Sequence, residues 1–471
     1  MKKSLALILA CVLVFSAFAA FAEDKTPTDP KPESIEISYS YTGALNADEY
    51  LARFEKQFEE TYGIKLKVNK YASAFEDIDV IKTAVASGTG PDMWHMDVNY
   101  FSAFKDTVIQ PIDPYLDDSI FGEYLDNGIG MWKSDDHFYA LPVSFSVVGF
   151  LYNKDAAAAA GVTLGDTWTF EEFEKALATC YDYYKDKKIT YSDGKEYPYW
   201  MLTTQHTMYY WWLFYGVYGG TPMYKTNNIA QEAFVNAIVK MAEWRAKGYL
   251  HYSGEVGPVS TSVAFANGAN VLFWPTGDWT ISTLTQQELG INTEALPMNV
   301  NYASIPAPLG QDGKPHTEIY NQGIVLNKAT TGWKAKACAE LIKFMVYDDD
   351  NWFNLFGPGD AHNYCMPGKK SWSEKYATDW INNLDHAKGF LYTLSNGVCN
   401  RPDYNNDNID VTTMTTGVIM DAFNFVDAAG SFNEADVRKL VTEKLEAQQA
   451  LYNIQLEEND RELDNPDAKV K

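Results

Sequence analysis

The stretch that decides the fold spans residues 147–173 and reads VVGFLYNKDAAAAAGVTLGDTWTFEEF. Its first six residues are mainly apolar and β-prone, which predicts a buried strand that ends at the polar residues 153–155. Five alanines and a glycine follow, a composition typical of a short helix with a glycine terminator. Thr169 and Glu172 then have the spacing of a capping box, so we expect a second helix to begin at Phe170.

The first third of the chain also alternates strand and helix patterns. Residues 34–40 and 64–68 alternate apolar with polar side chains, and residues 93–96 form a third run, which predicts three strands. Residues 46–62 and 75–87 carry apolar side chains at helical spacing, and a glycine follows each segment. This β-α-β-α-β order requires crossovers between parallel strands, so we expect a parallel sheet covered by helices.

Later segments complete the prediction of an α/β fold. Apolar residues at helical spacing predict helices over residues 230–247 and 333–346, and residues 270–274 have the pattern of a strand. A last long helix is expected to begin at Ser431, because its spacing to Glu434 is that of another capping box.

Length and charge narrow the class of protein. A chain of 471 residues exceeds what one hydrophobic core usually supports, so we expect two lobes. The net charge of −25 repels nucleic acid and anionic lipid, and we expect no nucleic-acid partner. An apolar content of 46% with 15% aromatic residues is too rich in core-forming side chains for a disordered chain.

Both ends of the chain carry segments that we expect to lie outside the folded lobes. Two lysines, an apolar run and an Ala-x-Ala motif within residues 1–22 match a secretory signal peptide. Residues 23–33 form a charged, proline-containing linker, and residues 457–471 form an acidic tail. We therefore expect an exported protein, in the periplasm or at the extracellular cell surface.

The five cysteines do not have the spacing of a metal or redox site. Cys11 lies inside the apolar run of the signal and comes too early for a lipoprotein box, which favours free secretion, although the sequence leaves a lipid anchor open. Cys180 and Cys338 lie on the apolar faces of predicted helices and are expected to be buried thiols. Cys365 and Cys399 lie in loop-like sequence, where a disulfide and two free thiols both remain open.

Short blocks in a fixed order extend over most of the chain. They are residues 86–93 (ASGTGPDM), 137–142 (HFYALP, the second arm of a predicted hairpin), 264–273 (AFANGANVLF) with 277–279 (GDW), the prolines 306 and 308, and 323–328 (GIVLNK) with 339–344 (AELIKF). In this order, and together with residues 147–173, the blocks resemble the extracellular solute-binding proteins of ABC importers, in the branch that includes the maltose-binding proteins.

The resemblance implies a two-lobed periplasmic-binding-protein fold. It has two α/β lobes, three interlobe crossings and a ligand cleft between the lobes, which close by a hinge motion. Transferred to this chain, it assigns residues 34–142 plus 306–322 to an N-terminal lobe and residues 147–303 plus 324–452 to a C-terminal lobe. The opening stretch is then the first crossing between the lobes, followed by the strand and the two helices that begin the second lobe.

Candidate ligand contacts follow from the chemistry of sugars, which bind flat aromatic faces through their C–H side and planar polar groups through their hydroxyls. Trp279 and Asp278 follow a predicted strand, where the family often places a stacking tryptophan. Other candidates lie at strand ends, before a crossing or in a late loop. The full set is Tyr41, Trp94, Asp97, Trp274, Asp278, Trp279, Asn321, Arg401 and Tyr404. The alternative for each tryptophan is a place in the core, and for Asp97 a solvated loop or helix cap.

The function that the resemblance implies is that of an exported receptor. It would capture a carbohydrate, an oligosaccharide, by lobe closure and deliver it to a membrane ABC permease that it docks transiently. We expect a monomer without cofactor, metal or catalytic residues; a calcium-like start at residues 403–407 lacks the acid at its twelfth position. Two alternatives are the same fold binding a peptide or polyamine, and a secreted glycoside hydrolase, which would need a facing pair of carboxylates.

Overall fold

The computed structural model describes residues 27–40, 47–70, 78–105, 107–190, 194–204, 212–220, 228–252, 255, 261–268, 270–288, 300–359, 365–376, 384–399 and 411–458. The predicted signal peptide, the first residues of the predicted linker and nearly all of the predicted acidic tail lie outside these residues. So do three candidate ligand contacts, Tyr41, Arg401 and Tyr404.

Strands and helices alternate through the chain, as the sequence predicts for an α/β fold. The main strands are β1 (Ser34–Ser40), β2 (Lys65–Lys70), β3 (Met93–Asp97), β4 (Ile109–Gln110), β7 (Ala140–Asn153), β10 (Trp200–Thr204), β11 (Leu250–Tyr252), β12 (Val271–Gly277), β13 (Tyr302–Ile305) and β15 (Ile319–Asn327). Short two-stranded pairs are β5 (Lys133–Ser134) with β6 (His137–Phe138), β8 (Lys188–Thr190) with β9 (Glu196–Pro198), and β14 (His316–Thr317) with β16 (Val398–Cys399). The helices used below are α2 (Ala47–Tyr62), α3 (Ile78–Ala86), α4 (Phe101–Phe104), α6 (Asp126–Ile129), α7 (Lys154–Ala159), α8 (Phe170–Tyr184), α10 (Glu232–Ala246), α12 (Trp279–Glu288), α13 (Gly332–Val346), α14 (Asp349–Leu355), α15 (Lys370–Lys375), α16 (Leu384–Asn396), α17 (Val411–Ala429) and α18 (Glu434–Glu458).

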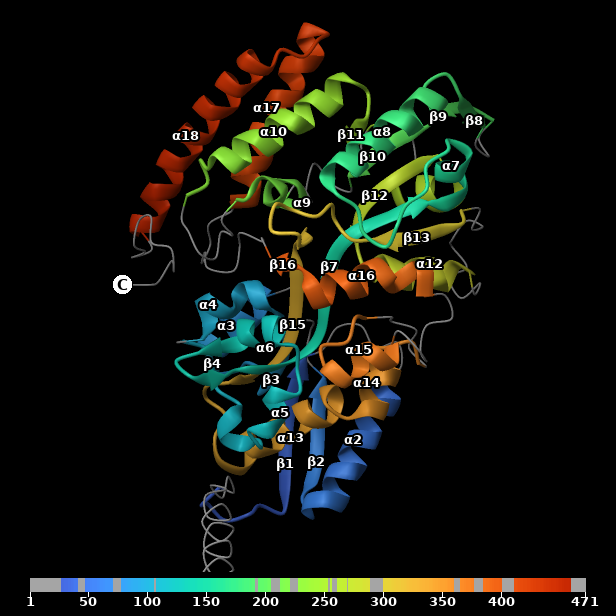
Figure 1. Cartoon of the computed structure of the whole chain (residues 1–471). Coiled ribbons are helices and arrows are strands. Elements are labelled where there is room, and N and C mark those ends of the chain that lie inside the picture. The colour runs from blue at the N-terminus through green and yellow to red at the C-terminus, as the bar shows by residue number, and fades with distance from the viewer. Residues whose placement is uncertain are drawn as a thin grey trace, which may run out of the picture.

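One sheet runs through both lobes. Its strand order is β11-β10-β12-β7-β15-β3-β1-β2, with β13 also paired to β7 and β4 to β15. Figure 1 shows the first lobe around β1, β2 and β3 at the bottom and the second around β10, β12 and β13 at the top, with β7 passing from one to the other. The fold is therefore two-lobed, and the two lobes are joined by a continuous strand.

The first lobe has the predicted β-α-β-α-β order. β1 pairs in parallel with β2 and with β3, and α2 and α3 connect the strands. The strand predicted over residues 34–40 coincides with β1, because its alternating Ile35 and Ile37 side chains face the core while Ser34 and Glu36 are exposed. Helices on the sheet bury these apolar faces.

The second lobe confirms the local predictions made from the opening stretch. Asn153 caps α7 by accepting from the backbone N–H of Ala156. Thr169 accepts from the backbone N–H of Glu172, and the Glu172 carboxylate accepts from the backbone N–H of Thr169, so the capping box at α8 is complete. Both caps satisfy N–H groups that the first helical turn leaves without partners.

β7 is longer than predicted and is the first crossing. The predicted strand over residues 147–152 is only its second half, which pairs with β12 and β13. Its first half, residues 140–147, pairs with β15. Pro142 lies inside this strand at a register shift between Gln322 and Gly323, which accommodates a residue that cannot donate to the ladder.

The lobe boundaries predicted after residue 303 are wrong. Residues 324–327 pair with β3, and α13 packs against β1 and α2, so the chain from residue 324 to α15 belongs to the first lobe and not to the C-terminal lobe. Residues 306–309 belong to the second lobe, because the Trp168 indole donates to Pro306 O at 2.7 Å and Leu309 N donates to Trp168 O at 2.9 Å. The second crossing is therefore β15, and α16 belongs to the second lobe again, because it packs on β13.

Two further expectations change near the carboxyl end. α18 begins at Glu434 and is capped by Asn433, whose Oδ1 accepts from the N–H groups of Ala435 and Asp436, so Ser431 is not its cap. Cys365 is a free thiol, so the disulfide considered for Cys365 and Cys399 is not formed. Cys180 and Cys338 are buried free thiols, as expected. None of the helices in the described part of the chain has the length and apolar character needed to cross a bilayer.

Candidate functional site

The carboxyl ends of strands from both lobes converge on one place. Asp97, the last residue of β3, lies opposite Gln322 at the start of β15, and the parallel strand β1 ends on the same side. In the second lobe, Gly277 at the end of β12 lies opposite Val148 of β7. We call residues 144–148 of β7 with residues 319–322 of β15 the crossing. In open α/β sheets, ligands bind beyond the carboxyl ends of strands, so the crossing is the candidate site.

Asn321 lies in the crossing, but its side chain is committed to the fold. The amide is fully buried, its Oδ1 accepts from the Trp132 indole at 2.9 Å, and its Nδ2 donates to Gly128 O at 2.7 Å. These bonds tie α6 of the first lobe to β15. Asn321 therefore positions the second crossing strand instead of presenting a free amide to solute.

The end of β3 contributes two buried polar residues. Asp97 is 6% exposed and occupies the strand's last position, beside the crossing. Burial lowers the pKa of His95 to about 4, although a hydrogen bond with Gln322 acts in the opposite direction. The imidazole is consequently neutral at physiological pH. The hydrogen bond with Gln322 joins the ring to β15, so His95 has a structural role.

The three tryptophan candidates differ in exposure. Trp94 has no exposed surface and packs with Ile81 and Phe104 in a core cluster, and Trp274 is 1% exposed, with its ring 5.4 Å from that of Phe265. These placements favour a core role for both. Trp279 is only partly buried. It begins α12 and its ring lies over Gly277, where an added Cβ would come within 2.0 Å of the ring.

Asp278 joins the end of β12 to the crossing strand. Its Oδ1 accepts from Val147 N at 2.8 Å, and its own backbone N–H donates to Val147 O at 3.1 Å. The carboxyl is completely buried, and burial raises its pKa to about 7 despite nearby amides and the Ser146 hydroxyl, which lower it. Asp278 was predicted as a ligand contact, but in this structure its side chain faces the interior.

Two described pockets are relevant to the choice of site. One, of about 410 Å³, is lined by both lobes: Leu125, Asp126 and Lys370 come from the first, and Lys314 and residues 394–397 from the second. α16 belongs to the second lobe through packing on β13, where Gly389 N donates to the Ser304 hydroxyl at 2.9 Å. A pocket shared in this way changes shape when the lobes move.

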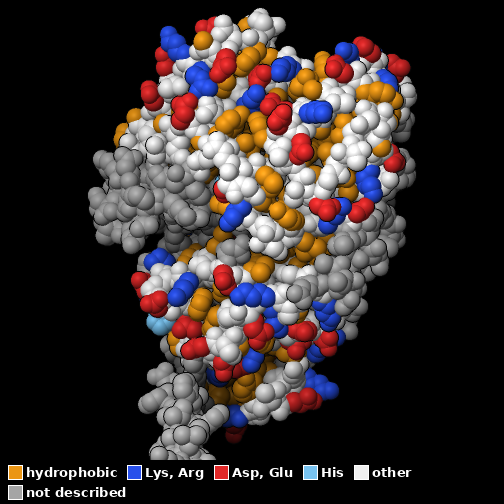
Figure 2. Space-filling model, in the orientation of Figure 1, with side chains coloured by type: hydrophobic (Ala, Val, Ile, Leu, Met, Phe, Trp, Pro, Cys, Tyr) orange, Lys and Arg blue, Asp and Glu red, His pale blue; other side chains and the backbone are white. Residues whose placement is uncertain are grey.

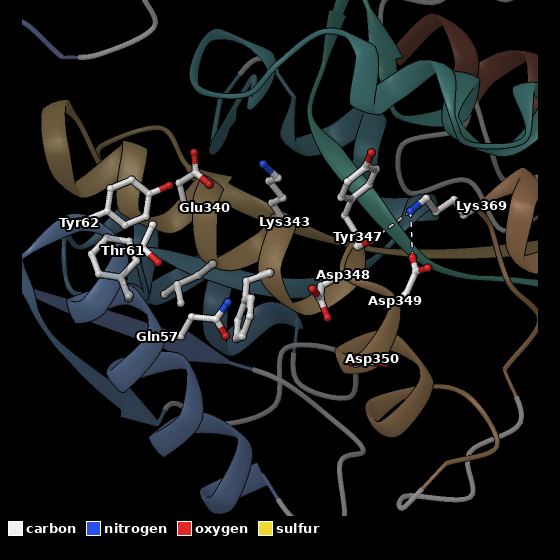
Figure 3. Close-up of a pocket in the computed structure, with 13 residues that line it drawn as sticks. Gln57, Thr61, Tyr62, Glu340, Lys343, Tyr347, Asp348, Asp349, Asp350 and Lys369 are labelled. Atoms are coloured by element: carbon white, nitrogen blue, oxygen red, sulfur yellow. Dashed lines mark hydrogen bonds and ion pairs between the residues drawn. The ribbon is translucent and has the colours of Figure 1, made fainter.

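The other pocket, of about 480 Å³, lies on the flank of the first lobe between α2 and α13; we call it the flank pocket. Figure 3 shows Tyr62 beside Glu340 at one end and Lys369 bonded to Tyr347 and Asp349 at the other. The Lys369 ammonium is 3.1 Å from the Asp349 carboxylate. All of the lining belongs to one lobe, so lobe closure would not reshape this pocket.

Sequence reasoning missed the loop at residues 365–368, which belongs to the first lobe and reaches the crossing. Phe145 N donates to Met366 O, and Leu125 N donates to Gly368 O. No strand or helix pattern marks this segment in the sequence; the glycine at 368 was the one signal, because an added Cβ would come within 2.8 Å of the Phe145 ring.

On the face shown in Figure 2, acidic and basic side chains are interspersed over both lobes.

A two-lobed binding protein is the class that this fold and these converging strand ends define. The family described as bacterial extracellular solute-binding protein matches residues 50–356, more than half of the chain. The chain belongs to this family. A curated relative, the maltotriose-binding protein of Pyrococcus abyssi (strain GE5 / Orsay), is 25% identical over 105 residues. That match covers 22% of this chain and 22% of the relative.

Solved structures share the two-lobed architecture over most of the chain. An ABC substrate-binding protein from Listeria monocytogenes in complex with cycloalternan aligns with a TM-score of 0.65 at 17% identity, covering 90% of this chain and 100% of that one. The sugar-binding protein MalE of Xanthomonas citri aligns with a TM-score of 0.64 at 14% identity, covering 90% of this chain and 99% of that one. The maltotriose-binding protein of Thermus thermophilus, bound with maltotriose, aligns with a TM-score of 0.59 at 16% identity, covering 88% of this chain and 99% of that one. At these identities the likeness establishes the two-lobed fold.

Proposed function

We propose that this protein is an exported solute receptor that captures a carbohydrate, an oligosaccharide, at the crossing and delivers it to a membrane ABC permease. Membership of an extracellular solute-binding family supports export and solute capture. The curated relative is named as a maltotriose-binding protein, and proteins of the same fold are described in complex with cycloalternan or bound with maltotriose, which supports a carbohydrate as the solute.

The observation that carries the proposal is the position of Trp279. It is a partly exposed aromatic ring at the carboxyl end of a second-lobe strand, beside a crossing that the first-lobe strands also reach. An indole face offers a sugar ring a flat apolar surface, and Asp97 supplies an acceptor at the facing strand end. The two groups together support a sugar as the solute bound at the crossing.

Capture requires the lobes to move, and the crossings provide the hinge. β7 and β15 join the lobes through few residues, so small backbone rotations there would swing one lobe against the other. The receptor binds without turning its solute over, acts as a monomer and docks transiently on its permease. No cofactor takes part.

The proposal is tested by titrating the purified chain from residue 23 onward with maltotriose, maltotetraose and cycloalternan. Tryptophan fluorescence should change, and the melting temperature should rise, because a ligand at 100 times its Kd adds about 2.7 kcal/mol to the stability of the native state. A response to polyamines or peptides, with none across a broad glycan panel, would contradict the carbohydrate assignment. Chromatography of the mixture should recover intact oligosaccharide; shortened products would instead favour a glycoside hydrolase.

A further inference from the structure

Asp278 stands where three parts of the molecule meet. The turn after β12 carries it in the second lobe, Val147 of β7 binds it from the crossing, and the loop at residues 365–368 covers it from the first lobe. That loop is fixed within the first lobe, because Cys365 N donates to Phe356 O at 2.9 Å and Lys369 pairs with Asp349. The Met366 backbone N–H acts on the Asp278 carboxyl across the lobe boundary.

The two oxygens of this carboxyl are used unequally. Oδ1 accepts from Val147 N at 2.8 Å, whereas Oδ2 is buried and has no hydrogen-bond partner among the described residues. Burying a charged carboxylate that has one oxygen without a hydrogen bond costs much free energy, whereas burying the neutral carboxylic acid costs far less. The geometry favours the protonated side chain as long as the first-lobe loop covers it.

The groups that face Asp278 supply no compensating positive charge. From β7 the Ser146 hydroxyl faces it, from the loop at 365–368 the Met366 amide and the Cys365 thiol, and from its own turn the backbone amides, among the described residues. Burial, and secondarily the charge of Asp278 itself, raises the pKa of the Cys365 thiol to about 12, so this thiol is uncharged at neutral pH.

We infer that Asp278 is a positioning residue that holds the turn carrying Trp279 against the crossing strand as an uncharged acid, and that its ionisation favours the separated arrangement of the lobes. Separation would uncover the carboxylate and let water reach Oδ2, which removes the cost of the charge. The consequence for solute capture rests on the proposed function: closure around the solute buries Asp278, so affinity falls as the pH rises.

The sign follows from proton linkage. The pKa of Asp278 rises from the ordinary 3.8 to about 7 in the covered state, so this state binds a proton more tightly than the unfolded chain does. Stability of the covered state, and affinity for solute, should therefore decrease as pH rises between about 4 and 7 and level off above about 7. The steepest possible change is about tenfold in the equilibrium per pH unit.

The experiment compares the wild type with Asp278→Asn, which keeps an oxygen for Val147 N but cannot ionise. Melting temperature and the radius of gyration from small-angle X-ray scattering are measured without ligand from pH 5 to pH 8.5. Relative to Asp278→Asn, the wild type should lose melting temperature up to pH 7 and should expand, while Asp278→Asn keeps its radius. Parallel profiles in the two proteins would overturn the inference. Asp182→Asn, the same change at an exposed helical position, should follow the wild type.

Two additions keep the test decisive. Ser146→Ala removes a hydroxyl that lowers the pKa of Asp278, so its profile should level off at a higher pH than that of the wild type; an unshifted profile would count against the inference even if Asp278→Asn failed to fold. Maltotriose affinity, measured at pH 5.5 and 8, should fall at least severalfold in the wild type and stay constant in Asp278→Asn. If maltotriose does not bind at all, the carbohydrate assignment fails, and the ligand-free profiles still decide the role of Asp278.

Discussion

The crossing and the flank pocket both have acidic and aromatic side chains nearby, but the acidic groups differ in which lobes they contact. In the flank pocket, Lys369 pairs with Asp349 inside the first lobe, and the Asp349 side chain is half exposed. At the crossing, Asp278 is fully buried and is bound or covered by elements of both lobes. A group shared by two lobes responds when they move, whereas a group paired within one lobe does not. The flank pocket is thus a poorer candidate for solute capture than the crossing.

The largest expected effect comes from removing the indole that supports the crossing. Trp132 is fully buried and donates to Asn321, so Trp132→Ala should destabilise the protein by about 3–5 kcal/mol. Chemical denaturation measures the loss. Trp132→Phe keeps most of the packing but leaves Asn321 Oδ1 unsatisfied, and its cost should be smaller, about 1–3 kcal/mol. Equal losses in the two variants would mean that the hydrogen bond does not support the crossing.

The next effect concerns binding at the crossing. Trp279→Ala removes the partly exposed ring and should weaken carbohydrate binding by about 1–3 kcal/mol, with little change in which oligosaccharide binds best. Isothermal titration calorimetry with maltotriose gives the affinity. Trp279→Phe should retain part of it, because a smaller flat ring remains. An unchanged affinity in the alanine variant would assign Trp279 to the core, together with Trp94 and Trp274.

A variant that lowers stability outside the crossing and the flank pocket serves as the control for Trp279→Ala. Thr169→Ala removes the capping box of α8 and should cost about 1 kcal/mol, since one N–H group of the first turn loses its partner. Maltotriose affinity should not change, because Thr169 is exposed and is not one of the residues of the crossing. A loss of affinity as large as that of Trp279→Ala would show that binding follows overall stability and not the local ring.

The smallest effect is expected in the flank pocket. Gln57→Ala changes an exposed residue that lines it, so both stability and maltotriose affinity should stay within about 0.5 kcal/mol of the wild type. Denaturation and calorimetry on this variant form the matched control for Trp279→Ala. A weaker affinity in Gln57→Ala alone would move the solute from the crossing to the flank.

The local predictions from the opening stretch were confirmed, whereas the cap expected at Ser431 and the predictions that depend on the direction of the chain were not. The capping box of α8 involves residues three apart, so its geometry can be read from Thr169 and Glu172 directly. Residues 323–328 were matched to a block of the family, but whether the chain enters the first lobe there or leaves it depends on the pairing of β15 with β3. That pairing joins residues more than 200 positions apart in the sequence.

The sequence shows which candidate residues lie next to strand ends, but not which of them are buried, because burial depends on contacts with distant parts of the chain. Trp94 and Trp279 both adjoin strand ends, and the sequence does not distinguish them. In the structure, Phe101 and Phe104 around α4 share a core cluster with Trp94, while the start of α12 leaves Trp279 partly exposed. Asp278 was selected for its position beside Trp279, but its burial depends on the loop at 365–368, nearly ninety residues later in the chain.

Amide hydrogen exchange with and without maltotriose tests the central claim most directly, because it reports both regions in one experiment. Binding at the crossing predicts slower exchange at the end of β3, along residues 319–322 and at the junction of β12 with α12, with α2 and α13 unchanged. Those segments come from both lobes, so their joint protection would establish capture between them. Protection confined to α2 and α13 would contradict the account and place the solute in the flank pocket.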